Sequence, residues 1–461
     1  ILHCGDGFLY QGEWRAPGYH EDRVYPASDK IPRPLGETPS PAAASEALEA
    51  LKSWNWDRGR EAADLDAYLL LGWTVTAKFG GALDWRSTVW ITGDAGSGKS
   101  TLQKLLTTLM GGDKALLYST DATEAAVRQF LAQHVQSTVP VLLDEAEPDL
   151  DNRRILAVVK LARQASSGAM VLRGGSDHQA AGFVVRSAFM FSSILIPPLL
   201  DQDLSRIAVL TLKDLPKGRT PPDPEHRKWA RCGRAIMDQV IAQWPRLHRT
   251  LELYRQALAA AGHSARGCDQ YGTLLAMADL AMSDVEPTPE ACAAWAARLK
   301  AESVTDRNDQ SADWQRCLNH LFGQHLDIFR SGERHSVWQW VRAAAGLTDD
   351  PDPLKAARAL PGWGLRVVGR GATAVLMVAN NHPMLGKLFE GTHWYSPAGQ
   401  TGVWVQAIKR VPGAESSPTA ANFSGVKARA WQFRLSAVPN FGHEDAPPEP
   451  ERQAVTGEDF A

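Results

Sequence analysis

Apolar residues recur in three kinds of pattern along the chain, and each pattern predicts a different type of structure. Residues 43–79 and 224–345 have apolar positions every three or four residues, which is typical of amphipathic helices. Between these segments, residues 86–213 alternate apolar strand-like runs with helical stretches, as a parallel sheet covered on both faces would. Residues 363–435 carry short alternating runs rich in Val, Trp and Gly, which predict mostly β-structure with at least one helix.

These patterns divide the chain into six expected segments of an α/β protein. They are the tail of a preceding domain with a Pro-rich linker (1–42), a helical collar (43–85), an α/β core with a parallel sheet (86–215), a helical domain (216–345), a mixed β-rich domain (346–440) and a disordered acidic, Pro-rich tail (441–461). The chain begins with Ile1, from which we expect a fragment of a longer protein.

Composition narrows the class of protein. The 461 residues are 44% hydrophobic and 22% charged, as in ordinary globular proteins of two or three domains. The net charge of −3 gives no overall basic field, so any nucleic-acid site has to be a local patch. Five cysteines without Cys-x-x-Cys spacing argue against a zinc ribbon and fit reduced thiols. Without a membrane-length apolar run or a signal peptide, we expect a soluble, cytoplasmic protein.

A glycine-rich loop is the strongest chemical signal. Residues 93–100 fit the pattern Gly-x-x-x-x-Gly-Lys-Ser/Thr between a β-branched strand at 87–92 and a helix that ends at Gly111. Such a loop wraps its N–H groups around phosphates at the positive end of the helix dipole. We therefore expect ATP and Mg²⁺, with Lys99 on the β and γ phosphates and the Ser100 hydroxyl on the metal. The expected binding residues are Gly93, Asp94, Ala95, Gly96, Ser97, Gly98, Lys99, Ser100 and Thr101.

Two adjacent carboxylates supply the second signal. Residues 139–143 form an apolar strand that ends in Asp144 and Glu145. We expect Asp144 to hold the magnesium shell and Glu145 to orient and deprotonate the attacking water. An apolar strand ending in acids is a weak signal alone, since such acids are often only solvated, but the glycine-rich loop makes it strong. Because one acid can serve the metal while the other serves the water, the pair favours hydrolysis over simple nucleotide binding.

The segment after these acids carries a distinctive order of elements. Residues 169–173 and 181–186 read as two short strands around a polar turn that contains His178, which predicts a β-hairpin. An apolar strand follows and ends at Ser192 and Ser193, and Arg206 precedes another apolar strand. Each residue also has a simpler interpretation: Arg206 as a salt-bridged surface residue, His178 as a turn residue, and Ser193 as a strand-end hydroxyl.

Over residues 45–215, this order resembles the helicase half of phage and plasmid primase-helicases, in superfamily 3 of the AAA+ ATPases. The resemblance implies a hexameric ring of identical subunits, single-stranded DNA in its channel, and an upstream primase or polymerase domain. It also implies that Arg206 reaches the neighbouring subunit's γ-phosphate, that Arg173 and His178 lie near the DNA, and that Ser193 occupies the sensor position. The family usually has Asn at that position, so either Ser192 or Ser193 orients water less directly, or the sensor lies elsewhere.

The C-terminal part leaves two interpretations open. Two helices followed by two strands around the Gly369–Gly371 turn suit a winged-helix module, with Arg366 and Arg370 near the wing. A β-rich packing or oligomerisation domain fits equally well. Trp394, Trp404, Lys409, Arg410, Lys427 and Arg429 interleave aromatic and basic residues, a mixture that binds single strands in some proteins and is an ordinary sheet surface in others.

The sequence thus predicts an ATP-driven helicase or translocase that acts on DNA in the replication of a mobile element. One alternative is an AAA+ ATPase that remodels proteins or serves defence signalling without unwinding nucleic acid. A non-enzymatic alternative, a nucleotide-gated DNA-binding or oligomerisation module, is disfavoured by the intact Asp144–Glu145 pair.

Overall fold

The computed structural model describes residues 1–57, 64–133, 138–148, 152–174, 180–197, 199, 201–215, 226–299, 313–326, 334–397 and 399–438. The chain divides into two compact units, Ile1–Asn308 and Asp309–Ala461, which are described separately. None of the helices in the described residues combines the length and the apolar character needed to cross a bilayer.

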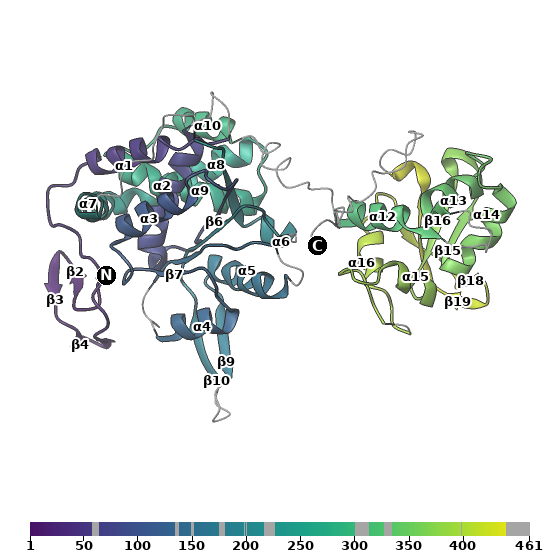
Figure 1. The fold of residues 1–461 in the computed structure, drawn as a ribbon, viewed down its shortest axis with the longest axis horizontal. Coiled ribbons are helices and arrows are strands. Elements are labelled where there is room, and N and C mark those ends of the chain that lie inside the picture. Colours follow the sequence, from purple (N-terminus) through teal and green to yellow (C-terminus); the bar gives the residue numbers. More distant parts are fainter. Residues whose placement is uncertain are drawn as a thin grey trace, which may run out of the picture. The chain divides into compact units, whose positions relative to one another are not determined.

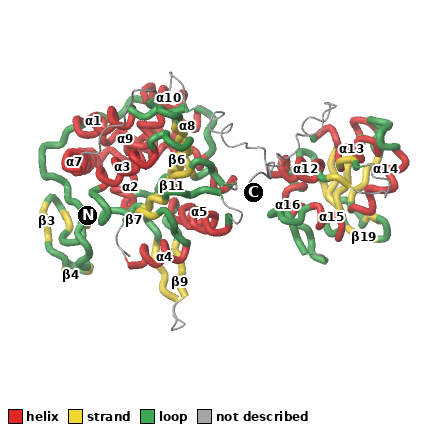
Figure 2. The backbone as a smooth tube through the Cα atoms, viewed as in Figure 1, coloured by secondary structure: helices red, strands yellow, loops and turns green. Residues whose placement is uncertain are grey.

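A five-stranded parallel sheet forms the centre of the first unit, which confirms the predicted α/β class (Figures 1 and 2). Its strand order is β12 (Ile207–Leu212), β6 (Thr88–Gly93), β11 (Phe189–Ser193), β8 (Val141–Leu143) and β7 (Leu117–Ser119). All neighbours run parallel, so the carboxyl ends of the five strands lie along one edge. That edge is where loops after the strands can bring distant residues together.

Alternate side chains of the sheet enter two separate cores, because successive residues of a strand point to opposite faces. Ile91, Leu142 and Met190 pack with α2 (Leu65–Phe79) and α3 (Lys99–Met110) on one face. Trp90, Val141 and Phe189 pack with α4 (Glu124–Gln133) and α5 (Arg153–Ser166) on the other. Helices therefore cover both faces, and the near-continuous apolar character of these strands follows from that burial.

The segment predicted as a separate collar belongs to the same core as the helices after the sheet. Helices α1 (Ala42–Lys52) and α2 share one cluster of buried residues with α7 (His226–Gln243), α8 (Leu247–Ala260), α9 (Ala265–Met282) and α10 (Pro289–Arg298). The two segments form one helical layer on the sheet because their apolar residues, together with those of α3 and one face of the sheet, share this cluster. Helical periodicity along the sequence does not reveal which helices share a core.

Short antiparallel strands precede and interrupt this fold. The chain starts with β1 (Leu2–His3), β2 (Phe8–Tyr10) and β3 (Glu13–Arg15) in one sheet and β4 (Gly18–His20) with β5 (Arg23–Tyr25) in another. The predicted hairpin after the acidic pair consists of β9 (Met170–Gly174) and β10 (Ala180–Val184), which pair antiparallel. The short helix α6 (Asp201–Leu204) leads into β12.

The second unit has its own hydrophobic core around Trp338, Trp340, Trp404, Phe389 and Phe433. Its helices are α12 (Asp313–Gly323), α13 (Val337–Ala344), α14 (Pro353–Ala359), α15 (Pro383–Leu388) and α16 (Trp404–Ile408). A four-stranded antiparallel sheet has the order β15 (Leu365–Val368), β16 (Val375–Ala379), β20 (Ala430–Arg434) and β17 (Glu415–Ser416). Two small ladders, β13 (His325–Leu326) with β14 (His335–Ser336) and β18 (Ala421–Phe423) with β19 (Val426–Ala428), complete it.

The boundary between the units lies at Asn308–Asp309 and not at 345–346, where the sequence pattern changes from helical to mixed. Helices α12 and α13 supply Leu318, Leu321 and Trp340 to the core of the second unit. The apolar residues of α12 and α13 have the same helical spacing as those of the helices in the first unit. Only the packing of these two helices shows that they belong to the second unit.

Candidate active site

The glycine-rich loop connects the carboxyl end of β6 to the first residue of α3, as the motif requires. Gly96 and Gly98 both have φ of 90°, in the left-handed region that favours glycine. A Cβ on Gly96 would meet no protein atom within 4 Å, so the conformation, and not packing, calls for glycine there. Ser100 is exposed in the first turn of α3, next to the free N–H groups of the helix end.

Two polar side chains of the loop point to an anionic ligand. The Lys99 amine donates hydrogen bonds to the carbonyl oxygens of Gly93 and Asp94, so its charge rests on backbone carbonyls and not on a carboxylate. The Ser97 side chain is fully buried, and its hydroxyl has no hydrogen-bond partner among the described residues. A buried hydroxyl left without a partner is costly, and a phosphate oxygen is a fitting acceptor.

Trp54, which the sequence analysis did not single out, packs on this loop. Its indole N–H donates to the carbonyl oxygen of Gly98 at 3.1 Å. A Cβ on Gly98 would lie 2.9 Å from the indole nitrogen, so the ring occupies the space that a larger residue would need. Residue 54 follows α1, which means that the segment predicted as a collar also holds the loop in place.

The acidic pair lies at the same edge of the sheet as the loop. Asp144 and Glu145 follow β8, and β11 is the strand between β8 and β6. Asp144 is half-buried and Glu145 is exposed. Glu145 has φ of 53°, and its N–H donates to Asp144 Oδ1 at 3.0 Å. A non-glycine residue in the left-handed region is uncommon, and such strain gathers at functional sites.

Tyr118, on β7, connects the acidic pair to the loop helix. Its hydroxyl lies 3.1 Å from Asp144 Oδ2 and 3.2 Å from Oε1 of Gln103, on α3. A hydroxyl has one proton, and the charged carboxylate is the stronger acceptor, so Tyr118 donates to Asp144. Burial, and then the carboxylates of Asp144 and Glu145, raise the pKa of Tyr118 to about 12, which keeps the phenol protonated.

Glu147 fixes the segment after the acids to β11. Its carboxylate accepts hydrogen bonds from the N–H groups of Ile194 and of Leu195, the latter at 3.1 Å. The N–H of Ala146 donates to the carbonyl oxygen of Ser192 at 2.9 Å. Glu145 is therefore held on both sides by residues that are bonded to neighbouring groups of the sheet edge.

The two serines at the end of β11 point to opposite faces. Ser193 is buried, and its hydroxyl accepts a hydrogen bond from the indole N–H of Trp90 at 2.8 Å, on the face that packs with α5. Ser192 is fully buried on the face shared with α3, and its hydroxyl has no partner among the described residues. Ser193 thus already accepts one hydrogen bond and keeps its O–H as a donor, whereas the Ser192 hydroxyl has no partner within the described residues.

The edge of the sheet beside the loop is hollowed. A cavity of about 550 Å³ is lined by Asp57, Thr92, Gly93, Asp94, Ile194, Thr211, Leu212, Lys213 and Asp214. These residues come from the carboxyl ends of β6, β11 and β12 and from the segment after α1. No group of three or more His, Cys, Asp or Glu side chains suited to holding a metal occurs within the ranges that the structure describes.

Arg206 lies at the opposite edge of the sheet from the loop, at the start of β12. Six residues at about 3.3 Å each separate it from the other end of that strand, so it cannot reach its own chain's loop. One guanidinium N–H donates to the carbonyl oxygen of Gln202 at 2.8 Å, and the group lies 5.9 Å from the Trp85 ring centroid. Burial, together with the charges of Arg266 and Arg163, lowers its pKa.

The nearest acid to Arg206 already has a partner. Asp203 accepts a hydrogen bond from Arg163 at 2.9 Å, and its side chain is nearly buried. Within the described residues, Arg206 makes no ion pair with a carboxylate. The partners of its guanidinium that the structure describes are the carbonyl oxygen of Gln202 and the Trp85 ring.

The expected DNA-contacting residues are only partly covered by the structure. Arg173 lies on β9, where its backbone pairs with Ala181. His178 lies outside the described residues. Their contact with DNA stays a prediction.

No model of a known protein family matches this chain, and no curated protein matches it either. Solved structures similar to it include an apo structure of the NrS-1 C-terminal region, 12% identical, with a TM-score of 0.35 over 92% of this chain and 82% of that one. Another is a full-length MCM homolog from Methanopyrus kandleri, 15% identical, with a TM-score of 0.31 over 65% and 73% of the two chains. Likenesses this low establish neither fold nor function, so any functional proposal has to rest on this chain's own residues.

Proposed function

We propose that this chain hydrolyses ATP in a ring of identical subunits and uses the reaction to move along DNA. The observation that carries the proposal is the meeting of the loop of residues 93–100 with Asp144 and Glu145 at one edge of a parallel sheet. The strand order, with β11 between the loop strand and the acidic strand, is that of AAA+ ATPases, the class that the sequence resembles.

The loop fits a triphosphate as substrate. Its left-handed glycines, the buried Ser97 hydroxyl without a partner and the Lys99 amine bonded only to carbonyl oxygens all suit phosphate oxygens. Lys99 supplies positive charge for the β and γ phosphates. Ser100 and Asp144 are the residues that would hold Mg²⁺, since hard cations prefer oxygen donors, and the ion supplies further neutralisation of phosphate charge.

Glu145 acts as the base in this proposal. Water attacks the γ phosphorus, its proton passes to the Glu145 carboxylate, and the bond from that phosphorus to the bridging oxygen breaks to give ADP and inorganic phosphate. Backbone hydrogen bonds of Glu145 and Ala146 hold this segment at the sheet edge, and the exposed Glu145 carboxylate is open to water, which supports this role. Ser192 is the better candidate for a water-orienting hydroxyl, since it lies on the face shared with α3 and has no hydrogen-bond partner among the described residues.

Arg206 is proposed to complete the site of the neighbouring subunit. It lies far from its own chain's loop and has no carboxylate partner within the described residues, as a residue that acts in another subunit requires. A guanidinium supplied in this way stabilises the charge that develops on the phosphoryl group. A hexameric ring, the form implied by the resemblance to superfamily 3, gives each Arg206 a neighbouring loop.

Two features support nucleic acid as the polymer along which the chain moves. The β9–β10 hairpin lies in the chain between α5, which follows the acidic pair, and the start of β11, whose carboxyl end lies at the acidic edge, so a shift of either element would move the hairpin. The second unit, residues 309–461, is neutral as a whole, but its charge is uneven: residues 313–438 contain 14 lysines and arginines against eight acids, and residues 439–461 contain one against six. Such a local basic excess is the electrostatic sign of a phosphate-binding surface.

The second unit also has the order of a winged-helix module. Helices α13 and α14 are followed by β15 and β16, which pair antiparallel around residues 369–374. Arg366 and Arg370 are both exposed, on β15 and in this turn. We propose that this unit binds DNA while the first unit moves it, in the replication of a phage or plasmid.

The experiment that tests the proposal is strand displacement from a forked DNA duplex. We expect unwinding that requires ATP and Mg²⁺ and is lost in the Glu145→Gln and Arg206→Ala variants. ATP hydrolysis without unwinding of DNA or RNA would overturn the helicase function and favour protein remodelling or defence signalling. Binding of ATP without hydrolysis would favour a nucleotide-gated binding or oligomerisation module.

A further inference from the structure

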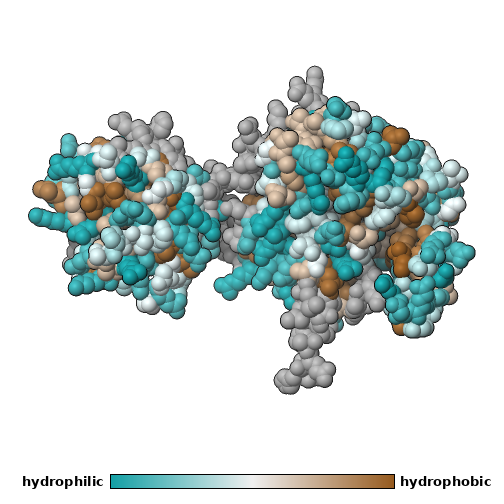
Figure 3. All heavy atoms as spheres, turned by 180° about the vertical axis from the view of Figure 1, so that it is seen from behind, coloured by the Kyte–Doolittle hydropathy of each residue, from teal (hydrophilic) through white to brown (hydrophobic). Residues whose placement is uncertain are grey.

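A second, larger cavity lies away from the glycine-rich loop. It has a volume of about 1280 Å³ and lies among the N-terminal strands, the end of α2, the starts of β8 and β11, and the 3₁₀ turn Trp244–Arg246. Figure 3 shows hydrophobic side chains gathered where the surface is hollowed beside the N-terminal strands. The volume exceeds that of most small-molecule sites, which are about 300–1,000 Å³.

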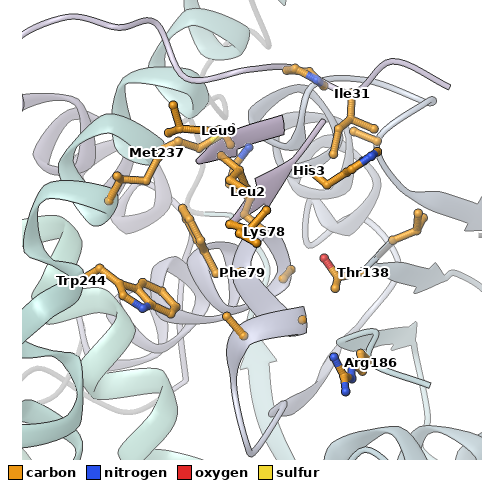
Figure 4. A pocket seen from close by; sticks show the side chains of 18 of the residues that line it. Leu2, His3, Leu9, Ile31, Lys78, Phe79, Thr138, Arg186, Met237 and Trp244 are labelled. Carbon is orange, nitrogen blue, oxygen red and sulfur yellow. The ribbon is translucent and has the colours of Figure 1, made fainter. Parts of the chain in front are cut away.

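The lining is largely apolar. Leu2, Leu9, Ile31, Phe79, Met237 and Trp244 contribute much of it (Figure 4). The Phe79 and Trp244 rings lie against each other, with centroids 5.4 Å apart. Such a surface suits a hydrocarbon or aromatic portion of a ligand.

The charged residues of the lining are all basic. They are Arg23, Lys78 and Arg186, and no Asp or Glu is among the lining residues. In Figure 4, Lys78 lies between the apolar group of Phe79 and Trp244 and the polar pair of Thr138 and Arg186. The cavity thus combines a largely apolar lining with basic residues and no acid.

Lys78 has no carboxylate partner in the described part of the chain. Its amine donates to the carbonyl oxygen of Met110, the last residue of α3, at 3.3 Å. The nearby thiols of Cys4 and Cys232 supply no charge at neutral pH, because burial raises their pKa values to about 11 and about 12.

The acids whose charges act on these two thiols, Asp6 and Glu46, are paired elsewhere. Asp6 bonds to Lys30 and Arg33, and Glu46 bonds to Lys228. An ammonium group placed in an apolar cavity without a counter-ion is unfavourable, and an anion from outside would relieve that cost.

We propose that this cavity binds an amphipathic carboxylate, an apolar chain whose single acidic group pairs with Lys78. This cavity is separate from the glycine-rich loop and from Asp144 and Glu145. The proposal therefore does not depend on whether the chain hydrolyses ATP. Burial lowers the pKa of Lys78 to about 8, so the amine is largely protonated at pH 7 and available to an anion.

Binding of radiolabelled palmitate, measured by equilibrium dialysis of the full chain, tests the proposal. We expect saturable binding of one palmitate per chain at pH 7. Lys78→Met, which keeps the length and loses the charge, should weaken binding by about tenfold or more, because a hydrogen bond to a charged group is lost. Lys78→Arg should keep the affinity, and Lys387→Met, an exposed lysine of the second unit, is the matched control.

Two further arms separate a built site from nonspecific uptake. Hexadecanol, which lacks the carboxylate, should bind more weakly than palmitate and with equal affinity to Lys78→Met and the unchanged protein. Lys99→Ala should bind palmitate normally, whatever its effect on ATP hydrolysis. Equal palmitate affinity in Lys78→Met and the unchanged protein, or uptake that does not saturate, would overturn the proposal.

The dependence of palmitate binding on pH provides an independent readout. Affinity should fall between pH 7 and pH 10 as the Lys78 amine loses its proton, and it should stay constant in Lys78→Arg. The other ionisable groups that line the cavity or lie near Lys78 are the Ile1 α-amino group, His3, Arg23, Tyr25, Arg186, Cys4 and Cys232. A fall of the same size in Lys78→Arg would assign the titration to one of these groups and would contradict the proposed role of Lys78.

Discussion

The Tyr118 hydroxyl donates a hydrogen bond to Oδ2 of Asp144 across 3.1 Å, which joins β7 to the acid that would hold the metal. We expect Tyr118→Phe to lower the rate of ATP hydrolysis about threefold to tenfold and to raise the Mg²⁺ concentration for half-maximal rate, because a hydrogen bond that orients the carboxylate is lost. A Mg²⁺ titration of the hydrolysis rate measures both. Tyr19→Phe, an exposed tyrosine of β4, is the control. An unchanged Mg²⁺ titration in Tyr118→Phe would show that Asp144 needs no such support.

Glu147 is expected to position Glu145 without touching substrate. Glu147→Ala removes the acceptor for the N–H groups of Ile194 and Leu195, so the rate of hydrolysis at saturating ATP should fall about tenfold while KM stays within about twofold. Glu147→Gln keeps one acceptor oxygen and should recover part of the rate. Steady-state kinetics of both variants, beside the exposed Glu390→Gln, measure this. A change confined to KM would contradict the positioning role.

The trans role of Arg206 predicts rescue in mixed rings. Lys99→Ala and Arg206→Ala subunits should each be inactive alone. In an equal mixture, about one quarter of the interfaces pair an intact loop with an intact Arg206, so about that fraction of activity should return. The measurement is ATP hydrolysis after the two variants are exchanged under conditions that dissociate the ring. No recovery after proven exchange would place both residues in the same subunit's site.

A buried ion pair in the helical layer predicts a large effect on stability. Arg246 bonds to Asp279 Oδ1 at 2.5 Å, both side chains are nearly buried, and the Tyr254 hydroxyl donates to Asp279 Oδ2 at 3.2 Å. Asp279→Ala leaves a buried guanidinium unpaired and should lower the free energy of unfolding by about 3–5 kcal/mol. Urea unfolding followed by circular dichroism measures this. The double variant with Arg246→Met should be more stable than Asp279→Ala alone, and the opposite order would contradict the ion pair's role.

The parts of the site that could be predicted from the sequence are those formed by residues close together in the chain. The strand before the loop, the glycines and the first turn of α3 are consecutive, and the pair Asp144–Glu145 directly follows an apolar strand. Each of these features is a short pattern with a known physical cause, so it can be recognised without the fold.

The supporting residues could not be found in this way. Trp54 lies 44 positions from Gly98, and Tyr118 lies 26 positions from Asp144, so neither contact leaves a pattern in the sequence. Ser192 and Ser193 differ only in the face of β11 to which they point, and the two cores decide which hydroxyl is bonded. The assignment of α12 and α13 to the second unit likewise depends on packing between segments that share one periodicity.

ATP hydrolysis with and without single-stranded DNA tests the central claim most directly. We expect the unchanged chain to hydrolyse ATP, with a rate that rises when single-stranded DNA is added, and the Lys99→Ala and Glu145→Gln variants to lose both the basal and the stimulated rates. Hydrolysis of the same rate at every concentration of single-stranded DNA or RNA would contradict the proposed motor on nucleic acid.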